Sequence, residues 1–106
     1  MMQTTITVRH CEVSDALRQH ALTVVERLGT VAARPMEMMV LFDAEGPTQT
    51  AELRLHLAKG EILVAKGAGA DHRTALDRAE EKLRRQLERA SGRPRRSRTA
   101  QPKNLR

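Results

Sequence analysis

The order of hydrophobic and polar residues predicts a strand followed by a helix near the start of the chain. Within residues 3–10, the β-branched residues Ile6 and Val8 alternate with polar ones, which is typical of a strand with one buried face. Ser14 is a suitable N-cap for the following helix. The apolar residues of this helix recur at steps of four, three and four: Leu17, Ala21, Val24 and Leu28. Gly29 is the expected C-terminal cap, although the pattern allows the helix to run slightly further.

Three further strands are predicted in the middle of the chain. Residues 36–42 have hydrophobic side chains on both faces, as a central strand does. After a loop expected at 43–49, residues 50–57 alternate clearly and direct one set of side chains to the core: Ala51, Leu53, Leu55 and Leu57. A short hairpin signal at 59–60 precedes a fourth strand at 61–66.

The last predicted element is a long helix over residues 71–90, separated from the fourth strand by a break at Gly67-Ala68-Gly69. Its apolar face consists of Leu76, Ala79, Leu83, Leu87 and Ala90. The predicted order is therefore β-α-β-β-β-α, an α+β fold. A strand–helix–strand start favours a right-handed crossover with parallel strands, whereas short loops make the later strands antiparallel. We expect a four-stranded sheet with both helices packed on one face.

Length and cysteine content indicate one small domain in a reducing compartment. The chain has 106 residues, and its single cysteine, Cys11, cannot form an internal disulfide. The longest apolar run, at 38–42, is far shorter than the roughly 20 residues that cross a bilayer. Residues 1–5 lack the basic and apolar stretches of a secretory signal. We expect a cytoplasmic protein without membrane association.

Positive charge is concentrated in the last quarter of the chain. Residues 1–81 hold nine basic and twelve acidic side chains, a net charge of −3, whereas residues 82–106 hold ten basic and one acidic, a net charge of +9. Residues 91–106 contain Pro, Gly and Ser and few apolar side chains, so we predict a disordered basic tail after a domain at 1–90. The tail either keeps the chain soluble or lies along phosphates through arginines that include Arg93, Arg95 and Arg96.

Catalytic or metal-binding constellations are not found in the sequence. The four histidines have no i, i+4 spacing, and Cys11 lacks a second thiol, so neither a zinc site nor an activated nucleophile is expected. Residues 67–69 lack the Lys-Ser or Lys-Thr of a phosphate-binding loop. Glu80 and Glu81 are neighbours on a helix and cannot face each other across a substrate. We expect no enzymatic activity, no cofactor and no small-molecule substrate.

The last helix has a stripe of basic side chains, which we call the basic ridge: Arg78, Lys82, Arg85 and Arg89. At 100° per residue these four lie within about 60° of one another and roughly 130° from the centre of the apolar face. The ridge is either an ordinary solvated face or the binding surface for a polyanion. Because Phe42 is the only Phe, Tyr or Trp, base stacking is disfavoured, and recognition of phosphates, sugars and shape is expected instead.

Several segments, in order and at the right spacing, resemble the ribosome hibernation promoting factor family, which includes ribosome-associated translation inhibitors. The start of the first helix at 12–18 (EVSDALR), the hairpin at 51–62, and the second helix at 71–77 and 82–87 (KLRRQL) are similar to that family's motifs. Within the second helix the sequence departs from the family pattern, because His72-Arg73 stands where family members have Met-Tyr.

The resemblance implies a specific function. Members of this family share the β-α-β-β-β-α fold, bind the small ribosomal subunit in the tRNA and mRNA channel near the decoding centre, and protect idle ribosomes while inhibiting translation. Lys82, Arg85 and Arg89 match basic positions of the family, as do Arg18 and Arg27 in the first helix. The expected partner is the small subunit with its rRNA, and the chain is expected to be a monomer away from the ribosome.

Two alternatives remain open from the sequence. One is a general RNA-binding module that uses the basic ridge to bind double-stranded RNA. The other is a protein-interaction domain, such as a sigma-factor modulator, whose open sheet face forms the binding surface. Neither the affinity nor an effect on ribosome pairing follows from the sequence.

Overall fold

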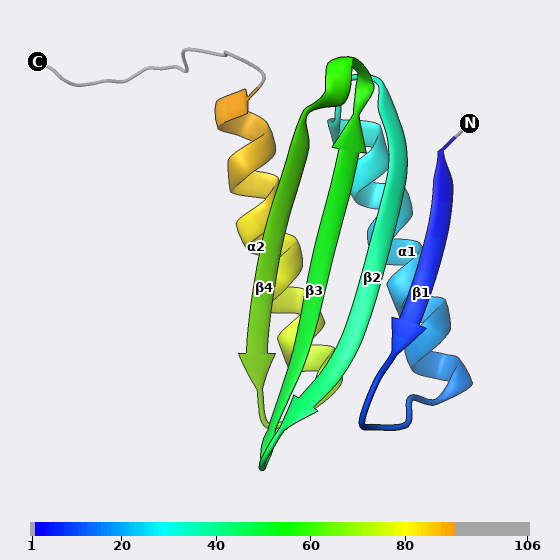
Figure 1. The fold of residues 1–106 in the computed structure, drawn as a ribbon, viewed down its shortest axis with the longest axis vertical. Helices are drawn as coiled ribbons and strands as arrows, with labels where there is room; N and C mark the ends of the chain where they lie inside the picture. Colours follow the sequence, from blue (N-terminus) through cyan, green and yellow to red (C-terminus); the bar gives the residue numbers. More distant parts are fainter. Residues whose placement is uncertain (1, 91–106) are drawn as a thin grey trace, which may run out of the picture.

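The structure, a computed structural model, describes residues 2–90 of the chain and consists of one sheet covered by two helices (Figure 1). The predicted tail lies outside the described residues. The elements follow one another as β1 (Gln3–Val8), α1 (Asp15–Val31), β2 (Pro35–Glu45), β3 (Thr48–Leu57), a short 3₁₀ segment η1 (Ala58–Gly60), β4 (Ile62–Gly69) and α2 (His72–Ala90). The strands lie in sequence order, with β1 parallel to β2 and the other pairs antiparallel.

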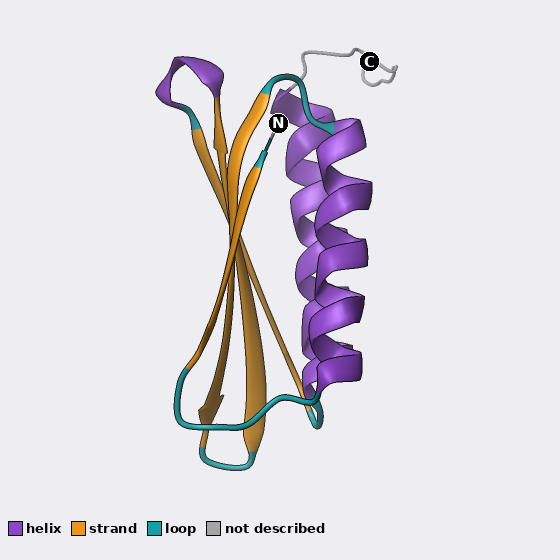
Figure 2. Cartoon of the chain, turned by 90° about the vertical axis from the view of Figure 1, so that its right-hand side faces the viewer, coloured by secondary structure: helices purple, strands orange, loops and turns teal. Residues whose placement is uncertain are grey.

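Both helices lie on the same face of the sheet, and no helix within residues 2–90 covers the other face (Figure 2). The predicted α+β fold and element order are therefore confirmed. The largest fully buried side chains come from α1, β2, β3 and α2: Val24, Leu28, Met38, Val40, Phe42, Leu53, Leu55, Leu76 and Leu83. None of the helices within residues 2–90 has the length and apolar composition that crossing a bilayer requires.

The start of α1 is as predicted, but its end is not. The side chain of Ser14 accepts a hydrogen bond of 3.0 Å from the backbone N–H of Leu17, which confirms the N-cap. The helix continues past Gly29 to Val31, and Ala32 is the C-cap, its N–H bonded to the carbonyl of Leu28. Gly29 is not among the residues with positive φ, so it does not form the left-handed cap expected of it.

The segment 43–49, predicted as a loop, is mostly strand. β2 runs to Glu45 and β3 begins at Thr48, so that only Gly46-Pro47 connect them. Gly46 has a φ of 61°, a conformation that lets a two-residue turn follow the right-handed twist of the paired strands. The hairpin predicted at 59–60 is confirmed as a tight turn, with φ of 76° at Lys59 and 82° at Gly60.

The break predicted at Gly67-Ala68-Gly69 is wrong, because β4 continues through all three residues and pairs with β3 as far as Gly69. The structure gives another reason for glycine at Gly67. A Cβ there would overlap the carbonyl oxygen of Ala75 and lie 2.7 Å from the backbone nitrogen of Ala79. Glycine thus lets the backbone of α2 approach β4 closely, and this approach fixes the position of the basic ridge.

Candidate nucleic-acid interface

The basic ridge lies on the exposed side of α2 that is next to β4. The first turn of α2 is held by Asp71, whose carboxylate accepts a hydrogen bond of 2.8 Å from the N–H of Thr74. This bond lowers the pKa of Asp71 below the ordinary aspartate value, so the cap is charged at neutral pH. Apolar residues on the opposite side of α2, among them Leu76 and Leu83, are fully buried against the sheet. The predicted separation of core face and basic ridge is present.

Two of the four ridge residues bind the backbone of β4. Arg78 Nη1 donates to the carbonyl of Ala68 at 2.7 Å, and Lys82 Nζ donates to the carbonyl of Lys66 at 2.8 Å. One turn further along, Gln86 Nε2 donates to the carbonyl of Val64 at 2.8 Å, with the same geometry as the first two contacts.

The regular spacing of these contacts follows from the dimensions of helix and strand. Four residues of helix rise by about 6 Å, and two residues of strand span about 6.6 Å, so side chains at every fourth helical position meet every second strand position. Sequence reasoning missed Gln86, although its spacing of four from Lys82 is a signal of the same row.

The other two ridge residues point to solvent. Arg85 Nη2 lies 3.8 Å from Glu81 Oε1, and both side chains are more than half exposed, so this ion pair is weak and screened by salt. The side chain of Arg89 is exposed and has no hydrogen bond or ion pair among the described residues. Arg85 and Arg89 are therefore the ridge cations that are most available to a ligand.

Arg27 occupies a different place, between the two helices. Its Nε and Nη2 each donate to a carboxylate oxygen of the buried Glu80 at 3.0 Å, and Arg84 adds a contact of 3.3 Å from the other side. These bonds raise the pKa of Arg27 further and neutralise its charge locally. His20 and Asp77 form a second interhelical contact, at 2.9 Å.

These interhelical pairs separate the predicted RNA-binding residues into two groups. The residues of α2 that face α1 include Glu80 and Asp77, whereas Arg78 and Lys82 face β4 on the other side of the helix. The structure thus brings the four ridge residues together but does not bring Arg27 into the ridge. Arg18, also on α1, is exposed, and its side chain has no hydrogen bond or ion pair within residues 2–90, while Arg93, Arg95 and Arg96 lie outside the described residues.

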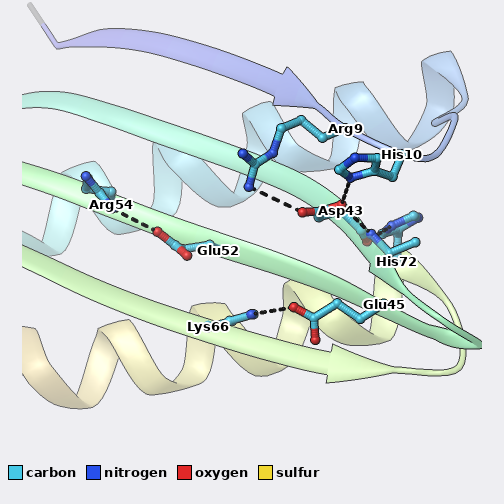
Figure 3. Close-up of polar contacts among 9 residues, drawn as sticks. Arg9, His10, Asp43, Glu45, Glu52, Arg54, Lys66 and His72 are labelled. Carbon is cyan, nitrogen blue, oxygen red and sulfur yellow. Dashed lines mark hydrogen bonds and ion pairs between the residues drawn. The ribbon is translucent and has the colours of Figure 1, made fainter.

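The open face of the sheet has charged side chains that are paired with one another (Figure 3). Its ion pairs are Arg9 with Asp43 at 3.3 Å, Arg54 with Glu52 at 3.2 Å, and Lys66 with Glu45 at 3.2 Å. Hydrogen bonds with His10 and with the N–H of Ala44 lower the pKa of Asp43. Because each of these cations has an acidic partner, this face is a weaker attractor of polyanions than the ridge.

His72 and Cys11 have structural surroundings. His72 Nε2 is 2.9 Å from the carbonyl oxygen of Asp43, and its ring meets Phe42 edge-on with centroids 5.5 Å apart, which ties the start of α2 to β2. Burial raises the pKa of the Cys11 thiol, which makes it a poorer nucleophile at neutral pH. Within residues 2–90, no group of three or more His, Cys, Asp or Glu side chains is placed to hold a metal ion.

Comparison with known proteins gives one consistent result. Residues 4–95 match the profile of the family described as sigma 54 modulation protein / S30EA ribosomal protein. The chain is 34% identical over 88 residues to the ribosome hibernation promoting factor of Salmonella typhimurium, covering 83% of this chain and 92% of that protein. It is also 34% identical over 86 residues to the ribosome hibernation promoting factor of Escherichia coli K12, covering 81% and 90% of the two chains.

Solved structures agree on the fold. A ribosomal subunit interface protein from Coxiella burnetii superposes with a TM-score of 0.77 at 17% identity, covering 87% of this chain and 100% of that one. The N-terminal domain of Thermus thermophilus Protein Y superposes with a TM-score of 0.72 at 25% identity, covering 85% and 99%.

Proposed function

The chain belongs to the sigma 54 modulation protein / S30EA ribosomal protein family, and we propose on this basis that it is a ribosome hibernation factor. In this proposal the protein acts without catalysis: it binds the small ribosomal subunit and its rRNA in the cytoplasm, occupies the channel of tRNA and mRNA near the decoding centre, and inhibits translation while the ribosome is idle. Support comes from the names of the relatives and from the sequence identity of 34% over most of both chains.

The observation that most supports RNA as the ligand is the basic ridge. Four cations lie in one stripe of α2, and the two nearest its C-terminal end, Arg85 and Arg89, have no strong acidic partner among the described residues. An interface that neutralises phosphates depends on such accessible cations, and its affinity falls steeply with salt. The paired charges of the open sheet face offer less to a polyanion.

The proposal is tested by co-sedimentation of the purified chain with small ribosomal subunits at two salt concentrations. The test variant is the double reversal Arg85→Glu with Arg89→Glu, because neither side chain holds β4 and the fold should be retained. We expect binding to weaken at least tenfold, which corresponds to about 1.4 kcal/mol. A loss of inhibition in cell-free translation should accompany the loss of binding.

The matched control is Arg9→Glu with Arg54→Glu, which changes the net charge equally but on the open face. We expect this variant to bind nearly as well as the wild type. If it loses binding while the ridge variant keeps it, the binding surface is the sheet, as in a protein-interaction domain. If free duplex RNA competes as well as small subunits do, the chain is a general RNA-binding module.

A further inference from the structure

The outer edge of β4 has an arrangement of polar groups that the basic ridge alone does not explain. β4 is the last strand of the sheet, with β3 on its inner side only. The backbone N–H of Leu57 donates to the carbonyl of Glu61. Because hydrogen-bonded pairs alternate along an antiparallel ladder, the odd-numbered residues of β4 are the ones bonded to β3. The even-numbered residues Val64, Lys66 and Ala68 therefore turn their backbone groups away from β3.

On this edge the carbonyl groups are occupied, whereas the N–H groups are not. In an antiparallel ladder the N–H and C=O of one residue point to the same side, so each even-numbered residue exposes both. All three carbonyls accept hydrogen bonds from side chains of α2. No acceptor within residues 2–90 is bonded to the three N–H groups, which leaves a row of donors at intervals of about 6.6 Å.

Such an edge is suited to an anion and not to another strand. A peptide strand that adds to a sheet needs carbonyl acceptors as well as N–H donors from the edge, and here α2 already uses the acceptors. An anion needs donors and positive charge only. The guanidinium of Arg78 binds the carbonyl of Ala68, and the ammonium of Lys82 binds the carbonyl of Lys66. Both therefore supply positive charge beside the row of N–H groups.

We propose that the outer edge of β4 is a binding track for the phosphodiester backbone of RNA, in which the N–H groups of Lys66 and Ala68 donate to phosphate oxygens between Arg78 and Lys82. This inference rests on the proposed function and specifies where RNA lies. Arg78, Lys82 and Gln86 act in two ways: they hold the carbonyl dipoles that would repel phosphate, and the two cations attract it. Lys66 contributes its backbone, because its side chain pairs with Glu45 on the open face.

The direct test is an NMR titration of the full-length, ¹⁵N-labelled chain with a short RNA hairpin. We expect the amide signals of Val64, Lys66 and Ala68 to shift strongly and those of Leu63, Ala65 and Gly67 to shift weakly, because only the first set faces outward. This alternation within one strand is an internal control. Equal shifts in both sets, or shifts confined to Arg85 and Arg89, would overturn the track and leave RNA binding by the ridge intact.

A substitution separates the neutral donors from the charges. Ala68→Pro removes one outward N–H at an edge position where proline is tolerated, and Ala68→Gly keeps that N–H as the matched control. We expect Ala68→Pro to weaken binding of the hairpin about tenfold, which is the effect of one hydrogen bond to a charged group. The slope of log affinity against log salt should stay unchanged, since no charge is lost.

Lys82→Gln should also weaken binding, but it should in addition reduce the slope of log affinity against log salt by about 0.7–0.9, because a charge is lost. If Ala68→Pro binds like Ala68→Gly, the N–H groups are not ligands and the track is wrong. If Ala68→Pro does not fold, the alternation of amide shifts in the wild type decides. If the wild type binds neither the hairpin nor small subunits, the proposed function fails as well, which is a different outcome from loss of the alternation alone.

Discussion

Gly67→Ala should destabilise the fold more than any other glycine-to-alanine change in the sheet, because α2 lies directly on this position. The added Cβ would overlap the carbonyl oxygen of Ala75 and lie 2.7 Å from the nitrogen of Ala79, and both atoms belong to helix backbone that cannot rotate aside. Relief requires α2 to move away from β4 by roughly 1–1.5 Å if ordinary contacts of about 3.5 Å are to be restored.

The magnitude follows from two opposing effects. Overpacking of this kind costs about 1–3 kcal/mol, and a clash with backbone belongs at the upper end. Replacing glycine within a strand recovers at most about 1 kcal/mol of conformational entropy. The net loss should be about 2 kcal/mol, which lowers the Tm of a domain of this size by roughly 8–16 °C.

Thermal unfolding followed by circular dichroism measures this loss, with Gly29→Ala as the control. Gly29 lies inside α1, and a Cβ there meets only the flexible end of Met2, at 3.0 Å. Alanine should therefore raise stability by up to about 1 kcal/mol at this position. If Gly67→Ala melts at or above the wild-type temperature, α2 does not lie as close to β4 as described, and the row of contacts from Arg78 to Gln86 loses its basis.

Three further predictions concern an acid, the thiol and the tail. Hydrogen bonds lower the folded-state pKa of Asp43, so its contribution to stability is present above the ordinary aspartate range and is lost as the pH falls through the lowered value. Asp43→Asn should therefore flatten the fall of Tm between about pH 5 and pH 2, and a fall as steep as that of the wild type would contradict this. Cys11→Ser should leave subunit binding and translation inhibition within about twofold of wild type, and selective loss of inhibition at unchanged Tm would indicate thiol chemistry. Deleting residues 92–106 removes six basic side chains, so subunit affinity should fall and its salt dependence should flatten, whereas a Tm lower by more than a few degrees would show that the tail packs on the domain.

Local pattern was sufficient for the architecture. The alternation in β3 and the stripe on α2 place Leu53 and Leu83 in the core, where both are fully buried. Ser14 caps α1 as its side-chain chemistry predicts. The strand–helix–strand order fixed the parallel pairing of β1 with β2, because the handedness of that crossover leaves few alternatives.

The failures arise where a distant part of the chain decides the conformation. Gly67 is a strand breaker by propensity, but the close approach of α2 makes it a strand residue here. Arg27 looks like a free cation in the sequence, and only the fold brings it to Glu80, which is 53 positions away. The placement of the ridge on one stripe was predictable from helical spacing, whereas its division into side chains bound to β4 and side chains open to solvent was not. RNA binding by the individual residues stays a prediction.

The two edges of the sheet differ in a way that affects self-association. Side chains of α2 cover the carbonyls along β4, whereas within residues 2–90 no side chain bonds to the outer backbone groups of β1. Growth of a fibre by strand addition needs two adhesive edges on every copy. Two copies, each with β1 as its only edge strand open to pairing, can join through β1, and the edges of the resulting pair are then the two β4 strands, whose carbonyls are occupied. Concentrated protein should therefore stop at dimers and should not seed amyloid-like aggregates from the folded state.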